Sequence, residues 1–170
     1  MARRMTIEER ERFLAEPRVG IISVARDDGR PPLTTPTWFS YEPGGLITFF
    51  AGTQGRTARR SALIERAGAV TFSVHTDDYP YRYVTIEGTV VGEERPPSEQ
   101  QLLAIVGRYL PEDLAREFVA GELANPGPGF VLYSVRPERW LTSDFSDEPV
   151  TSDSLEPDHP SGAETHRDSA

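Results

Sequence analysis

Residues 20–41 read GIISVARDDGRPPLTTPTWFSY, and this stretch decides the fold. Its first residues belong to a mostly apolar run, residues 19–25. This run has several β-branched side chains, which is typical of a strand. Asp28 and Gly29 follow, a pair that favours a turn between antiparallel strands. Residues 32–41 then form a second extended segment, so the stretch predicts a β-hairpin.

The sequence before and after this hairpin predicts further strands and short helices, and hence a mainly β domain. Four more strands are predicted by apolar or alternating runs at residues 46–51, 69–74, 81–91 and 130–135. Helices are predicted from capping and turn signals at residues 6–14, 58–66, 98–109 and 111–123. Six strands joined mostly by hairpins predict a closed or nearly closed antiparallel barrel with short helices.

The composition divides the chain into a domain, residues 1–145, and an acidic tail, residues 146–170. The tail carries seven acidic residues against a single arginine, which is most of the net charge of −9. Its few apolar residues follow no helix or strand period, so it cannot bury enough surface to offset the entropy of ordering. We expect a disordered tail that contributes solubility.

The remaining composition argues against several classes of function. Without its tail the domain is nearly neutral and has no basic stripe, which disfavours nucleic-acid binding. No apolar run has the length of a membrane span and no targeting segment is evident, so we expect a cytoplasmic protein without membrane contact. The absence of cysteine and lysine excludes thiolate sites and lysine Schiff bases. The spacing of His, Asp and Glu predicts no metal site.

Three arginines, Arg56, Arg59 and Arg60, stand at the expected start of the helix over residues 58–66. Cations are mildly unfavourable there because the helix dipole places partial positive charge at that end. Free backbone N–H groups and guanidinium forks would instead suit a bound phosphate, which the backbone at Gly52 could approach closely. A solvated arginine-rich loop explains the same residues, and their spacing leaves both interpretations open.

Aromatic side chains flank these arginines in the sequence. Pro36 and Trp38 lie in the second expected strand, where a proline is typical of an edge or a bulge beside a pocket. Phe49 and Phe50 end the third expected strand, shortly before the arginines. An apolar slot next to a cationic cluster would suit a planar ring that carries a phosphate. The alternative is that these aromatic residues belong to the core.

Nucleophilic catalysis finds little support in the sequence. His75 is the only histidine outside the tail, and no serine lies in a G-x-S-x-G motif. His75 is therefore interpreted as a structural histidine.

Residues 6–136 resemble the pyridoxamine-phosphate-oxidase-like split-barrel family, whose members bind flavins or the deazaflavin F420. The resemblance is carried, in order, by GIISVARDDGRPPLTTPTWFSY, LITFFAGT, RRSALIERAGAVTFSV and YRYVTIEGTV. It implies a six-stranded antiparallel split β-barrel with short flanking helices. It also implies a homodimer with the cofactor at the subunit interface.

The resemblance further implies a set of cofactor-binding residues. Arg60 and Ser61 match the basic–hydroxyl pair that grips the cofactor phosphate in the family, and Arg56 and Arg59 would supplement it. Arg60 replaces the usual lysine, and Leu63 or a neighbour replaces a common asparagine. The ring system and ribityl chain would be lined by the backbone of Thr35, Pro36, Thr37 and Trp38 and by Phe49, Phe50, Ala51 and Gly52. Tyr83 or the last strand would contribute from the partner subunit.

The activity implied by the resemblance is hydride transfer between a flavin or deazaflavin and a small organic substrate, with no catalytic residue assigned. F420 is favoured over FMN because short members with a TTPTW-type strand often belong to the deazaflavin branch. Vitamin B6 oxidation is not expected, since the substrate-binding segment of a true pyridoxine-phosphate oxidase is missing. Two alternatives remain open. One is a carrier of flavin, F420 or haem, with His75 as the candidate haem ligand; the other is an oligonucleotide-binding barrel that stacks bases on Trp38 and the phenylalanine pair.

Overall fold

A computed structural model describes residues 2–52, 55–124 and 129–146 of the chain. The elements, in chain order, are α1 Ile7–Ala15, β1 Gly20–Val24, β2 Leu33–Thr37, β3 Ser40–Tyr41, β4 Ile47–Gly52, α2 Gly55–Ala67, β5 Ala69–His75, β6 Arg82–Glu94, α3 Glu99–Val106, α4 Glu112–Ala124 and β7 Phe130–Asp144. The tail expected from residue 146 onwards lies, apart from Ser146, outside the described residues.

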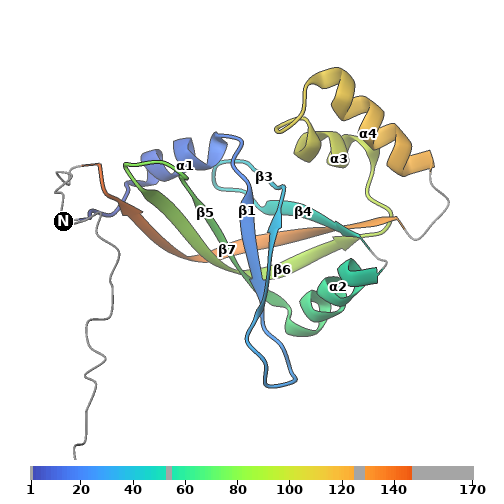
Figure 1. Ribbon diagram of the computed structural model, residues 1–170, viewed down its shortest axis with the longest axis horizontal. Helices are drawn as coiled ribbons and strands as arrows, with labels where there is room; N and C mark the ends of the chain where they lie inside the picture. The colour runs from blue at the N-terminus through green and yellow to red at the C-terminus, as the bar shows by residue number, and fades with distance from the viewer. Residues whose placement is uncertain (1, 53–54, 125–128, 147–170) are drawn as a thin grey trace, which may run out of the picture.

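The strands form one antiparallel sheet that curls into a half-barrel, with the order β2-β1-β5-β6-β7-β4-β3 (Figure 1). Strands β2 and β3 lie at opposite edges, although only Trp38 and Phe39 separate them in the chain. The chain itself therefore connects the two edges at this point. The predicted class, a mainly antiparallel split barrel with short flanking helices, is confirmed.

The prediction of six strands is wrong, because the described part of the chain contains seven. The segment expected as one strand over residues 32–41 is divided at Trp38, where the chain crosses from one edge of the sheet to the other. The last strand is also longer than expected: β7 continues to Asp144 and pairs with β6 along its length. The register shifts twice along this pairing: Glu138 of β7 is passed over between Glu87 and Gly88, and Val91 of β6 between Val90 and Gly92.

The barrel core follows from strict alternation along the strands. In β1 and β4 every second residue is buried, and their inward side chains pack with Phe13 and Leu14 of α1. Gly20 is required by this packing, because a Cβ atom there would lie 2.1 Å from the ring of Phe72. The capped helix start expected at Thr6 is confirmed, and it takes the form of a capping box with Glu9.

Helices α3 and α4 form a separate small core beside the barrel (Figure 1). The buried side chains of this second core are Leu102, Val106, Ala115 and Val119. The capping box expected at Ser98 and Gln101 starts α3. Partly buried aromatic side chains of the barrel, Trp38, Phe50 and Phe130, pack against the same cluster and connect it to the sheet. Among the described residues, no helix is long and apolar enough to cross a membrane.

Candidate functional site

An open cavity of about 420 Å³ lies between the barrel strands, α2 and α4. Its walls are mainly apolar and aromatic, and its lining residues are Val19, Pro36, Thr37, Trp38, Phe50, Gly52, Arg60, Phe118 and Phe130. Arg60 is the one charged residue among them. The cavity therefore combines a slot suited to a planar ring with a single cation.

The guanidinium of Arg60 is half-buried and anchored to the barrel. Its Nη1 atom donates to Thr35 Oγ1 over 2.9 Å, and its Nη2 atom donates to the Phe50 carbonyl over 3.3 Å. Its Nε atom is buried without a hydrogen-bond partner, and Arg60 makes no ion pair with a carboxylate of the described residues. Burial lowers the pKa of Arg60, since desolvation disfavours the charged form. A partly desolvated guanidinium without a carboxylate partner would be stabilised by an anion bound in the cavity.

Arg59, the preceding residue, points elsewhere. Its Nη2 atom lies 3.4 Å from Asp28 Oδ2 on the β1–β2 turn, and its side chain is 54% exposed. Arg66, two turns further along α2, pairs with Asp27 on the same turn. Arg59 and Arg66 therefore hold α2 against the hairpin and do not line the cavity.

The expected start of this helix is wrong by three residues. Helix α2 begins at Gly55, not at residue 58, so Arg59 and Arg60 lie in its second turn and the argument from the helix start does not apply to them. Arg56 is near the start of the helix, but its side chain lies outside the part of the structure that is described.

The other predicted site residues divide into two groups. Pro36, Thr37, Trp38, Phe50 and Gly52 line the cavity beside Arg60, and Thr35 holds the guanidinium. Four residues lie outside the cavity wall. Phe49 and Ala51 are in the barrel core, Ser61 is 4% exposed and donates to the Gly52 carbonyl, and Tyr83 lines a separate cavity with His75.

Val19, Phe118 and Phe130 complete the wall and were not predicted from the sequence. Phe130 lies against Phe50, with ring centroids 4.7 Å apart, because β7 pairs with β4. Phe118 follows Ala115 by three positions on α4, which predicts an inward side chain. That spacing does not indicate which other element the helix covers, so the contact with Trp38 depends on tertiary packing.

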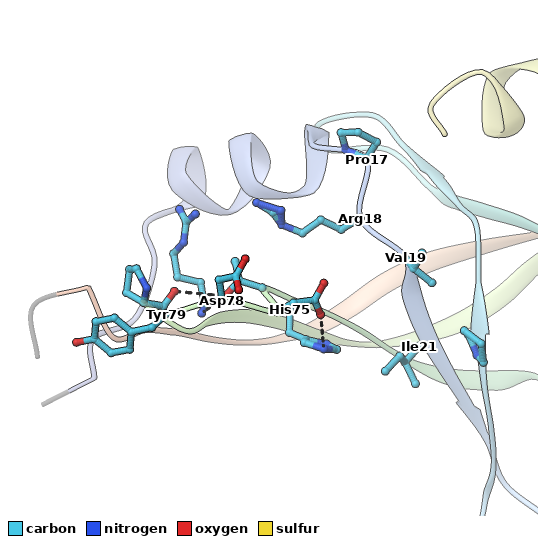
Figure 2. A pocket seen from close by; sticks show the side chains of 12 residues that line it. Pro17, Arg18, Val19, Ile21, His75, Asp78 and Tyr79 are labelled. Carbon is cyan, nitrogen blue, oxygen red and sulfur yellow. Dashed lines mark hydrogen bonds and ion pairs between the residues drawn. The ribbon is translucent and has the colours of Figure 1, made fainter. Parts of the chain in front are cut away.

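A larger cavity of about 650 Å³ shares Val19 and Pro36 with the first (Figure 2). Its other residues carry charges of both signs, including Arg18, Asp78 and Arg82. His75 also lines this cavity, and its Nε2 atom is 3.6 Å from Asp77 Oδ1 with the side chain 45% exposed. In the described residues, no group of three or more His, Asp or Glu side chains is placed to hold a metal ion.

A search of curated proteins yields no match. An F420 reductase structure is 28% identical, covering 77% of this chain and 94% of its own, with a TM-score of 0.57. A FAD-binding protein from Mesorhizobium loti is 19% identical over 85% of this chain and 98% of its own, with a TM-score of 0.55. The heme storage protein HutZ from Vibrio cholerae is 17% identical over 82% of this chain and 96% of its own, with a TM-score of 0.58.

The family model described as pyridoxamine 5'-phosphate oxidase matches residues 6–144, which include every described strand and helix. A single match to the family model therefore includes both the split barrel and helix α2, which carries Arg60. The chain belongs to the pyridoxamine 5'-phosphate oxidase family.

Proposed function

We propose that this chain is a cytoplasmic oxidoreductase that binds a phosphate-bearing flavin or deazaflavin in the cavity beside Arg60. One observation carries the proposal: Arg60 presents a half-buried guanidinium, without a carboxylate partner among the described residues, to an aromatic slot. A phosphate accepts the forked, charge-assisted hydrogen bonds that such a group offers.

The cavity walls fit the remainder of such a molecule. Trp38, Phe50 and Phe118 would contact a conjugated ring and exclude water from it, and the backbone at Gly52 would allow close approach near Arg60. A bound flavin or deazaflavin supplies hydride transfer to or from a small organic substrate. The protein would bind and orient both molecules.

F420 is the favoured cofactor, and FMN is the alternative. The preference is supported by the 28% identity to an F420 reductase over 77% of the chain. Parallel fluorescence titrations of the purified protein with F420 and FMN test it. Micromolar binding of F420 with weaker binding of FMN is expected; the reverse order would identify a flavin protein, and binding of neither would refute the proposal.

A carrier role is the second candidate function. It is favoured by the absence of an acid or base among the cavity-lining residues, where Arg60 is the one ionisable group, and by the similarity to a heme storage protein. Rapid-mixing reduction of a bound cofactor and its reoxidation by organic acceptors distinguish the two functions. An enzyme turns over, whereas a carrier holds its ligand unchanged, and haem binding would give an intense Soret band.

We also propose that two copies of the chain associate through the outer face of the sheet. One outward row crosses five strands without a charge, through Pro36, Ile21, Ser73, Thr85 and Leu141. Leu141 is 53% exposed, and Pro36 also lines the cavity, so a partner on this face would lie close to the cofactor. Light scattering after size-exclusion chromatography should give the mass of a dimer, and Leu141→Glu should convert it to the monomer. A monomeric wild-type protein would refute this association.

A further inference from the structure

The segment after α3 attaches the α3–α4 pair to the barrel through two adjacent side chains. Arg108 donates from Nη2 to the carbonyls of Leu14 and Glu16, over 2.8 and 3.0 Å, at the end of α1. Tyr109 contacts the two segments that enter and leave the β1–β2 hairpin. Docking of the helical pair is therefore coupled to the position of the hairpin.

The hydroxyl of Tyr109 forms hydrogen bonds to the backbone of two residues, and each of these is next in sequence to a residue of the cavity wall. It donates to the Arg18 carbonyl over 2.9 Å and accepts from the Phe39 amide over 3.2 Å. Val19 follows the first position and Trp38 precedes the second, and both line the cavity. Burial raises the pKa of Tyr109, so its hydroxyl remains protonated and able to donate at neutral pH.

The ring of Tyr109 also holds the indole of Trp38. The two rings are stacked with centroids 5.1 Å apart and an interplanar angle of 7°. Phe118 of α4 lies on the same indole at 6.3 Å and an angle of 57°. The orientation of the Trp38 indole is therefore set by residues of the segment after α3 and of α4.

We infer that Tyr109, which does not itself line the cavity, is a positioning residue that fixes Trp38 as a platform for a flat conjugated ring. It acts in two ways, by stacking on the indole and by tying the backbone beside Val19 and Trp38. This inference rests on the proposed function for the identity of the ring. It assigns to the α3–α4 region a role in ligand recognition, since the connection between the helices supplies Tyr109 and α4 supplies Phe118.

The test uses the full chain with Trp140→Phe, because Trp38 is then the only tryptophan. Tyr109→Phe removes the hydroxyl and keeps the ring. Tyr41→Phe is the matched control. The Tyr41 hydroxyl likewise makes two part-buried hydrogen bonds, donating to Glu11 over 3.1 Å and accepting from the Gly44 amide over 3.2 Å, but Tyr41 does not adjoin the cavity wall. Measurements are the time-resolved fluorescence anisotropy of Trp38 and the affinities for F420 and FMN.

In Tyr109→Phe we expect faster depolarisation of Trp38 and an affinity about three- to tenfold lower for whichever cofactor the parent binds, as follows from losing hydrogen bonds of ordinary strength. Tyr41→Phe should leave both quantities at the parental values while lowering the melting temperature by a similar amount. Parental anisotropy and affinity in Tyr109→Phe, or equal losses in Tyr41→Phe, would overturn the inference. If the parent binds neither cofactor, the proposed function fails, and the anisotropy of Trp38 alone decides the positioning role.

Discussion

The two sides of helix α2 use adjacent arginines for different purposes. On the hairpin side, Arg59 and Arg66 each reach a carboxylate of the β1–β2 turn. On the cavity side, Arg60 donates to a hydroxyl and a carbonyl, and no described carboxylate neutralises it. Exposed ion pairs contribute little and are common, whereas a desolvated cation without an anion is unfavourable in the free protein. The comparison separates arginines that attach a helix from the one suited to hold a ligand.

The largest effect is expected on the cavity side. Arg60→Ala should weaken cofactor binding by about 1.5–3 kcal/mol, roughly 10- to 150-fold, because a charge-assisted bond to phosphate is lost. Arg60→Lys should retain part of the affinity, since an ammonium keeps the charge without the fork. Fluorescence titration measures both, and unchanged affinity in Arg60→Ala would remove this residue from the site.

A much smaller effect is expected one residue earlier. Arg59→Ala should change cofactor affinity less than twofold, because its guanidinium faces Asp28 and lies outside the cavity wall. The melting temperature of the Arg59→Ala variant should fall only slightly, because an exposed ion pair contributes little to stability. A loss of affinity comparable to that of Arg60→Ala would show that the two sides of α2 are not separate.

The smallest effect concerns pH on the hairpin side. A hydrogen bond from Arg30 lowers the pKa of Asp28 below its usual value in the folded protein. A depressed folded-state pKa stabilises the protein above the ordinary aspartate range, and this contribution is lost as the pH falls through the folded-state value. The melting temperature of Asp28→Asn should therefore be slightly lower than that of wild type at neutral pH and equal to it in strong acid. A difference that persists unchanged in acid would contradict this assignment.

What the sequence predicts correctly is local. The capped helix start at Thr6, the capping box at Ser98 and the β1–β2 hairpin around Asp28 and Gly29 depend on residues close in the sequence, and such signals do not depend on the rest of the fold. The connection itself is longer than a tight turn, since eight residues separate Val24 from Leu33. The second half of β7 was missed, because the expected strand ended at residue 135, where the apolar run gives way to Arg136 and Pro137. The strand exists there because β6 is long enough to pair with it.

The candidate site follows the same division. Pro36, Trp38 and Arg60 were predicted from residue type and resemblance, and the structure brings them to one cavity. Ser61 was assigned a role beside Arg60, but successive helix positions face different directions, and its hydroxyl lies against Gly52. Phe118 and Tyr109 were not predicted as site residues, because their contacts with Trp38 arise only when the helical pair docks on the barrel.

The central claim is that Arg60 binds the phosphate of the cofactor. The most direct test compares affinities for FMN and riboflavin, which differ only by the phosphate, in wild type, Arg60→Ala and Arg59→Ala. Wild type and Arg59→Ala should both prefer FMN by about tenfold or more, and this preference should nearly vanish in Arg60→Ala, because the affected interaction is the charge-assisted bond to phosphate. A preference for FMN that survives in Arg60→Ala would contradict the account.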